Sequence, residues 1–298
     1  MHNPFFSVII PTHNRANLLS QAIQSVLNQT YNNFELIIID DHSTDNTQEI
    51  IKAFSDSRIK SIVNDHKKGA AGARNAGIFK AMGQWVAFLD DDDIWFPQKL
   101  ELQYDMIHNV GKIVGLIYTG YAVYDFDKMK EVQIITPEKE GWIQKDLLYT
   151  NCIGPPCSVI IRKSLLEQIK GFDDDFPAYQ DCDLYVRIAG LAQIAYIKDT
   201  LLYVRTSGND RISVNPQKKL DGFLLFQKKY NALIKNNPVL KHRISSVILY
   251  YAIRLKNWPV VFKFLPWTIA GVMFNLRNLL KILWGIYLVI IKSKKADL

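Results

Sequence analysis

Four consecutive carboxylates, Asp90 to Asp93, directly follow an apolar run in the stretch WVAFLDDDDIWFP at residues 85–97. Like charges side by side repel one another, and an unpaired carboxylate is costly to bury. A strand that brings four of them to one point is therefore typical of a cation site. Hard oxygen ligands favour Mg²⁺ or Mn²⁺, ions that keep several waters and bridge substrate phosphates. We predict a metal and diphosphate site here; the alternative is a solvated acidic turn ahead of a helix that starts near Pro97.

The elements that would position these carboxylates alternate between strand and helix patterns over the first hundred residues. Apolar runs of strand length occur at residues 7–10, 34–40, 58–63 and 85–89. Helical spacing of apolar side chains occurs at residues 16–29, 44–54 and 71–81. This order predicts an α/β fold with a mainly parallel sheet flanked by helices on both faces. Further strands are expected at 112–124, 132–136 and 157–161, and a short helix at 181–189.

Polar clusters stand at the ends of three of these expected strands. They are Pro11-Thr12-His13-Asn14-Arg15, Asp40-Asp41-His42-Ser43 and the aspartate run Asp90 to Asp93. Ligands of open parallel sheets bind outside the carboxyl ends of the strands. We therefore expect all three clusters to meet in one crevice.

Six motifs in a fixed order resemble those of family 2 inverting glycosyltransferases with the GT-A fold. They are FSVIIPTHNR near the start, DDHSTDNT at 40–47, GAAGARNAGI at 69–78, FLDDDD at 88–93, GFDDDF at 171–176 and QDCDLYVRIA at 180–189. The resemblance covers about residues 5–210 and points to enzymes that build bacterial surface polysaccharides. It implies a Rossmann-related GT-A domain and a hexosyltransferase that moves a sugar from a nucleotide-sugar, foremost a UDP-sugar, to a saccharide or lipid-linked saccharide.

The resemblance also implies roles for single residues on the donor side. Asp92 would be the direct ligand of Mn²⁺ or Mg²⁺, and Asp93 would start the next segment structurally. The nucleotide-sugar would be bound by Pro11, Thr12, Asn14, Arg15, Asp41, Arg74, Asp90 and Asp91. Asp41 would contact the base. As alternatives, Asp41, Ser43 or Thr44 caps the following helix, and Arg74 makes a structural ion pair beside glycines that serve helix packing.

Inverting transfer requires a base that deprotonates the acceptor hydroxyl while the metal takes up charge on the departing diphosphate. The family position of this base matches Asp181, whereas Asp183 is expected to cap the helix or pair with Arg187. The residue before the base is often Glu in the family, and this chain has Gln180 instead. Further on, a loop at 204–211 offers Arg205 or Arg211 to the diphosphate; the alternative is a plain surface loop.

Charge is distributed unevenly along the 298 residues. The chain has net charge +7, yet residues 206–298 hold 16 Lys and Arg against three Asp, and the first 205 residues are net negative. Three cysteines are too few and too irregular for a disulfide framework or a zinc site, so buried free thiols are expected. The apolar run at 5–10 lacks a basic flank and is too short for a secretory signal, which predicts a cytoplasmic location.

The basic C-terminal part is expected to form a helical extension. We predict a catalytic domain at 1–214 and a helical region at 215–298 that is broken at Pro238, Pro259 and Pro266. Its longest apolar run, Ile282–Ile291, is about half of the ~20 residues that a membrane span needs. An amphipathic helix on the inner face of the cell membrane fits better, with basic and aromatic side chains at the headgroups. These are Trp267, Arg277, Lys281, Trp284, Tyr287, Lys292 and Lys295. The alternative is a packed helix or a homo-oligomer contact.

Two other classes of protein compete with this interpretation. A nucleotidyltransferase that makes a nucleotide-sugar would show a Gly-rich loop with Arg and Lys after the first strand, where this chain has Pro11 to Arg15. A non-catalytic membrane or nucleic-acid adaptor would use the basic tail and would not require Asp41, Asp92 and Asp181 to meet in one crevice. We expect no nucleic-acid partner.

Overall fold

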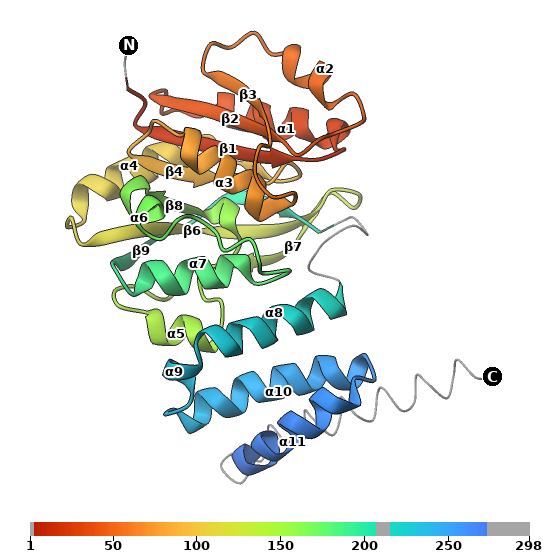
Figure 1. The fold of residues 1–298 in the computed structure, drawn as a ribbon. Helices are drawn as coiled ribbons and strands as arrows, with labels where there is room; N and C mark the ends of the chain where they lie inside the picture. Colours follow the sequence, from red (N-terminus) through yellow and green to blue (C-terminus); the bar gives the residue numbers. More distant parts are fainter. Residues whose placement is uncertain (1–2, 207–214, 273–298) are drawn as a thin grey trace. The chain divides into compact units, whose positions relative to one another are not determined.

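The computed structural model describes residues 3–206 and 215–272, which belong to two compact units (Figure 1). The first unit comprises Met1–Asp174 and Gln180–Ser207, and the second comprises Asp175–Tyr179 and Gly208–Leu298. The domain boundary predicted at residue 214 lies outside the described residues, as does most of the predicted amphipathic tail, from residue 273 onward.

The described part of the first unit is built on one nine-stranded sheet. The strands run in the order β3-β2-β1-β4-β8-β6-β9-β5, and β7 pairs with β6 beside this path. Their bounds are β1 Phe6–Thr12, β2 Phe34–Asp40, β3 Ile59–Val63, β4 Trp85–Phe88, β5 Ile94–Trp95, β6 Val114–Asp125, β7 Lys130–Ile135, β8 Val159–Arg162 and β9 Gln193–Arg205.

The sheet is parallel where the sequence alternates strand and helix, and mixed beyond that. Strands β3, β2, β1 and β4 are all parallel, as predicted. The second half adds antiparallel pairs: β8 with both β4 and β6, β6 with β7, and β5 with β9. Only β6 and β9 are parallel there. Strands β6 and β7 are joined by a short turn, which permits only antiparallel neighbours.

Seven α-helices and a short 3₁₀ turn connect these strands within residues 3–206. Their bounds are α1 Ala16–Leu27, α2 Thr47–Lys52, α3 Ala70–Lys80, α4 Lys99–Asn109, α5 Gln144–Tyr149, η1 Pro156–Ser158, α6 Lys163–Gln168 and α7 Gln180–Ala189. The helices expected in the first hundred residues are present: α1 and α2 are shorter than predicted, and α3 is shifted by one residue. Strand β9 and helices α5 and α6 were not predicted.

Helices α1 and α3 cover opposite faces of the sheet, because alternate residues of a strand point to opposite sides. Val8 and Ile10 of β1 join the hydrophobic core that includes Leu19 of α1. Ile9 faces α3 instead, where a Cβ atom on Gly77 would come within 2.6 Å of its Cγ2 atom. Gly77 therefore lets α3 approach the sheet, which confirms a packing role for this glycine.

The second unit is helical in its described part. It contains α8 Pro216–Lys229, α9 Asn231–Ile234, α10 Pro238–Arg254 and α11 Trp258–Val272. The side chains of Asn215 and Asn237 cap α8 and α10, each followed by a proline at the first helical position. The expected break at Pro266 is wrong, since α11 continues through it to Val272. Among the described helices, none is long and apolar enough to cross a membrane.

Candidate active site

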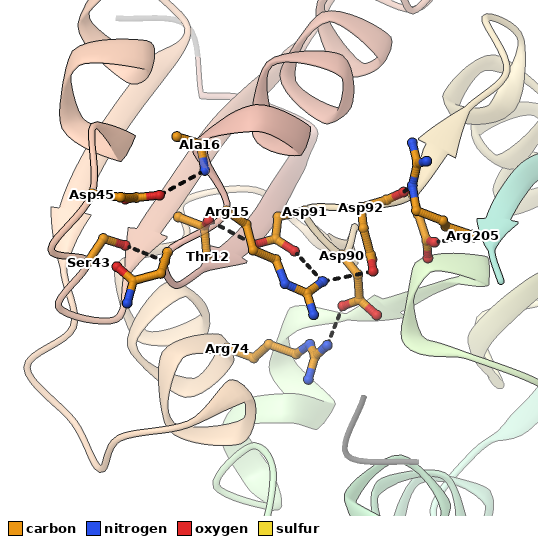
Figure 2. Close-up of polar contacts among 12 residues, drawn as sticks. Thr12, Arg15, Ala16, Ser43, Asp45, Arg74, Asp90, Asp91, Asp92 and Arg205 are labelled. Carbon is orange, nitrogen blue, oxygen red and sulfur yellow. Dashed lines mark hydrogen bonds and ion pairs between the residues drawn. The ribbon is translucent and has the colours of Figure 1, made fainter. Parts of the chain in front are cut away.

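The carboxyl ends of β1, β2 and β4 meet through Thr12, the last residue of β1. Its carbonyl oxygen accepts the backbone N–H of Asp41 at 2.8 Å, and its Oγ1 donates to the carboxylate of Asp91 at 2.8 Å (Figure 2). Strand β1 can make both contacts because it lies between β2 and β4. The predicted convergence of the three polar strand ends is confirmed.

The turn after β1 is fastened to the turn after β2. Asn14 has a left-handed backbone with φ 52°, and its N–H donates to Ser43 Oγ at 3.0 Å. Its side-chain oxygen accepts the N–H of Thr44 at 2.7 Å. Helix α2 begins after Asn46, which makes no side-chain cap. Ser43 and Thr44 therefore bind Asn14 in the turn after β1, and the alternative that they cap α2 is wrong.

Asp41 is buried and holds the loop that leads into α3. Its carboxylate accepts the amide of Asn64 at 2.6 Å and the backbone N–H of Gly69 at 2.8 Å, so it does not cap α2 either. Gly69 has φ 110°, and a Cβ on Gly72 would lie 1.7 Å from the carbonyl oxygen of Lys67. Asn64 was not among the predicted site residues, although it directly follows β3 and so stands at a strand end like the three polar clusters.

Two arginines hold three members of the aspartate run. Arg15 Nη1 lies 2.8 Å from Asp92 and 3.3 Å from Asp91, and the guanidinium of Arg74 pairs with Asp90 (Figure 2). The ion pair that the alternative for Arg74 required is thus present. Arg15 thus joins the first and third polar clusters, and Arg74 joins α3 to the third.

The four aspartates experience different environments. Burial raises the pKa of Asp91 to about 6, against the opposing effects of its Thr12 hydrogen bond and of Arg15. Asp93 is buried as well, and burial raises the pKa of its carboxyl. That carboxyl accepts the backbone N–H of Arg205 at 3.0 Å and so ties the run to the end of β9. The predicted structural role of Asp93 is confirmed.

Arg205 is held among protein groups. Its Nε donates to the carbonyl oxygen of Asp92 at 3.1 Å, its Nη2 donates to Gln21 at 3.2 Å, and its guanidinium carbon lies 3.8 Å from the centre of the Phe126 ring. These contacts give Arg205 a structural role at the aspartate run. Arg211, the other arginine predicted for this loop, lies outside the described residues.

Within residues 3–206 and 215–272, one group of side chains has the spacing of a metal site. One potential ligand atom from each of Asp90, Asp93 and Cys157 falls within 4.8 Å of the others. This group omits Asp92, the predicted ligand. Burial raises the pKa of the Cys157 thiol, so a protonated sulfur is a poor partner for a hard cation. The carboxylates of the run fit Mg²⁺ or Mn²⁺, and the sulfur does not.

Asp181 lies in the first turn of α7, with one carboxylate oxygen held in place. The amide nitrogen of Asn151 donates to its Oδ2 at 3.0 Å, and the amide oxygen of Asn151 accepts the N–H groups of Ile153 and Gly154. Burial raises the pKa of Asp181, while the Cys182 N–H and the charge of Arg74 oppose the rise. No sequence signal distinguished Asn151 from other loop asparagines.

Arg74 links the aspartate run to Asp181 electrostatically. It is buried, it contacts Asp90, and its charge also lowers the pKa of Asp181. Asp183 is separate from this group: its carboxylate accepts Arg187 Nε at 2.8 Å and lies 2.7 Å from Arg187 Nη2, so the predicted pairing with Arg187 is confirmed.

Pro11 takes no part in the polar network described above, whereas two thiols border it: Cys157 hydrogen-bonds with Asp93, and Cys182 hydrogen-bonds with Asp181. Pro11 is buried within β1 and lies opposite Ile39 of β2. The three cysteines are free thiols, as predicted; Cys157 and Cys182 are buried, and Cys152 is half-buried. The site is therefore formed by carboxylates, arginines and amides, with two buried thiols in contact with its carboxylates.

The comparison with known families now identifies the class of protein. Residues 7–170 match the model of glycosyl transferase family 2. The chain belongs to this family, and the protein is a glycosyltransferase with the GT-A fold. Family membership favours this class over a nucleotidyltransferase or a non-catalytic adaptor.

Among relatives, the chain is 47% identical over 265 residues to WfaP of Escherichia coli, a UDP-Glc:alpha-D-GlcNAc-diphosphoundecaprenol beta-1,3-glucosyltransferase. The match covers 83% of this chain and 92% of WfaP. Among solved structures, S. aureus TarS 1–349 in complex with UDP-GlcNAc has a TM-score of 0.66 at 17% identity, over 87% of this chain and 79% of that one.

A second solved structure is the mannosyltransferase PcManGT from Pyrobaculum calidifontis in complex with GDP-Man and Mn²⁺. It has a TM-score of 0.60 at 17% identity and covers 98% of this chain and 87% of its own. At such identities the two solved structures show the fold alone.

Proposed function

We propose that the enzyme transfers glucose from UDP-glucose to an N-acetylglucosamine unit carried on a polyprenyl diphosphate, forming a β-linkage. The single observation that carries this proposal is the 47% identity that extends over 92% of WfaP. Such an acceptor belongs to the assembly of surface polysaccharides on lipid carriers. UDP-glucose is an α-linked donor, so a β-linked product means that the reaction inverts the anomeric carbon.

The donor would lie across the ends of β1, β2 and β4. Asp41 supplies acceptor oxygens for a uracil N–H or a ribose hydroxyl, since its two present partners leave lone pairs free. Arg15 and Arg74 can pair with phosphate oxygens. Pro11, Thr12 and Asn14 shape the turn that places Arg15, and Asp90 and Asp91 border the same crevice.

We propose Asp92 as the metal ligand, with Asp90 beside it. Both carboxylates are hard oxygen donors, and both are now balanced by arginines that a cation and a diphosphate could engage instead. Mn²⁺ or Mg²⁺, when bound, would offset the charge that develops on the departing diphosphate. The mannosyltransferase with the same fold was solved with Mn²⁺, which is in keeping with a divalent ion and does not select its ligand.

Asp181 would act as the general base toward the acceptor hydroxyl. A general base works best when its pKa lies close to the working pH, and burial moves the pKa of Asp181 upward in that direction. Asn151 donates to Oδ2 and so holds the carboxylate in place. The Arg74 guanidinium limits this rise in the pKa of Asp181, because its positive charge favours the charged carboxylate.

We further propose that the protein works on the cytoplasmic face of the cell membrane, as a peripheral protein. The acceptor of WfaP is linked to undecaprenol, and residues 206–298 of this chain carry net charge +13. An anionic membrane surface would attract such a segment.

The proposal is tested with the full chain, labelled nucleotide-sugars and a synthetic GlcNAc-diphosphate lipid, in detergent and with Mn²⁺. We expect transfer from UDP-glucose, and a β-glucosyl product by NMR of the anomeric proton. Transfer from a different nucleotide-sugar with none from UDP-glucose would overturn the donor assignment. An α-linked product would overturn inversion and, with it, the role of Asp181.

A further inference from the structure

Helix α11 has one side that is buried and another, largely exposed side that is apolar. Val261, Phe264 and Thr268 are buried within the second unit. Trp258, Phe262, Leu265 and Ile269 follow one another at intervals of four, three and four residues, which places them within about 60° on a helix with ~100° per residue. We refer to these four residues as the α11 apolar face.

Three of the four residues of the α11 apolar face are open to solvent, and Leu265 is half-buried. Trp258 is 53% exposed, Phe262 is 69% exposed and Ile269 is 57% exposed. A single exposed apolar residue is ordinary on a protein surface, but a row of large apolar side chains on one helix face marks an interaction surface. The described residues leave this row uncovered, so its partner has to be sought elsewhere.

The charge around this face indicates which partner fits. Residues 215–272 contain ten Lys and Arg and a single acidic residue, Asp221. Lys256 and Lys263 are exposed and flank the start of the face in sequence. Electrostatic attraction to nucleic acid would explain the basic residues but not the exposed Trp, Phe and Ile. An anionic lipid interface accounts for both, because it takes up apolar and aromatic side chains beneath negatively charged headgroups.

We propose that the α11 apolar face inserts into the headgroup region of an anionic membrane and holds the enzyme there. Helix α11 would lie in the plane of the interface, which agrees with the finding that no described helix can span a bilayer. The purpose of this contact rests on the proposed function, since it concentrates the enzyme where a lipid-linked acceptor lies. The contact itself is a separate physical property and can be measured without any acceptor.

The first experiment measures binding of the full chain to vesicles of phosphatidylethanolamine with phosphatidylglycerol. The test variant is Trp258→Ser/Phe262→Ser, and the matched control is Trp142→Ser, because Trp142 is 55% exposed and lies in the first unit. We expect the partition coefficient of the test variant to fall at least tenfold and that of the control to stay within twofold of the unchanged protein. Equal binding by all three proteins would overturn the proposal.

The second experiment reads insertion directly, in variants that keep an aromatic ring. Vesicles with brominated acyl chains quench tryptophans that enter the bilayer. We expect the quenched fluorescence intensity to fall in Trp258→Phe and to be unchanged in Trp142→Phe. Unchanged quenching in Trp258→Phe would overturn insertion of this face. A variant with altered oligomeric state in light scattering but unaltered vesicle binding would do the same, because a second copy would then cover the face.

A third measurement separates this inference from the proposed function. In detergent with a short water-soluble acceptor, we expect Trp258→Ser/Phe262→Ser to transfer glucose as fast as the unchanged enzyme, and to lose transfer only when the acceptor is embedded in vesicles. Vesicle binding through the α11 apolar face without transfer from UDP-glucose would support the membrane contact and refute the proposed reaction. Normal transfer to the embedded acceptor by this variant would refute the docking surface alone.

Discussion

The aspartate run of the first unit and the basic helices of the second both concentrate charge of one sign. The aspartates are paired or buried, whereas most of the basic residues are exposed to solvent. Asp90, Asp91 and Asp92 each face an arginine, and Asp93 is buried against a backbone N–H. Residues 215–272 contain ten basic residues and one acidic residue, and many of the basic residues are exposed. Buried charge has to be paired locally, whereas solvated charge acts at long range and is weakened by salt.

Single substitutions should therefore have larger effects in the buried network than among the exposed lysines. A group in the buried network acts through defined atoms, so removing it changes chemistry or leaves a partner unsatisfied. A group among the exposed lysines acts as one of many and is replaceable. The predictions below set the two regions against each other.

The largest effect is expected for Asp181→Asn, which keeps the shape of the side chain and removes its basicity. Turnover should fall by about 10²–10⁴, with donor binding nearly unchanged, because the base acts only in the chemical step. Steady-state kinetics and calorimetric titration with UDP-glucose measure the two quantities. Asp199→Asn, at an exposed position of β9, is the matched control and should behave like the unchanged enzyme. Near-normal turnover in Asp181→Asn would move the base elsewhere.

Asp92 and Asp93 are neighbours with opposite expected phenotypes. Asp92→Ala should abolish stimulation by Mn²⁺ and reduce turnover by at least about tenfold, since it removes a metal ligand. Asp93→Ala should keep the metal response but lower the free energy of unfolding by about 1–3 kcal/mol, because it strands the Arg205 N–H. Metal titration of activity and thermal unfolding distinguish the two. A full metal response in Asp92→Ala would contradict the ligand assignment.

Asn151→Ala should alter the pH dependence more than the maximal rate. Asn151 donates to the carboxylate of Asp181, and this bond favours the charged form. Its loss should raise the pKa of Asp181 further, by about one unit if the bond contributes about 1.5 kcal/mol. The base works deprotonated, so activity is lost as pH falls through this pKa. The acidic limb of the kcat/KM profile should therefore move to higher pH. An unmoved limb would show that Asn151 does not influence the pKa of Asp181.

The smallest effect is expected for Lys235→Gln on the exposed surface after α9. The free energy of unfolding should change by less than about 0.5 kcal/mol. Binding to anionic vesicles should weaken by no more than about 1 kcal/mol at low salt, and the difference should vanish at high salt. Denaturant unfolding and vesicle sedimentation at two salt concentrations measure both. A large loss of stability would show that the basic side chains of these helices are held in specific ion pairs or hydrogen bonds.

Much of the donor side could be predicted because it is built from local signals. Apolar runs followed by polar clusters indicated β1, β2 and β4, and parallel pairing then required their ends to meet. The pairing of Asp183 with Arg187 follows from helical spacing alone, since residues four apart lie on one face. The second half was harder because β8 pairs between β4 and β6, and β6 with β9, across long separations in the chain. Asn151 belongs to that half.

The kinds of element, the chemistry of the side chains and the strand ends at which they stand follow from the sequence, because they depend on periodicity over a few residues. The role of each member of the aspartate run follows from the folded structure instead. Thr12 reaches Asp91 across 79 positions, and Arg205 reaches Asp93 across 112. Four identical neighbours are equivalent in the sequence, and they become different only when partners from distant segments bury, pair or expose each one.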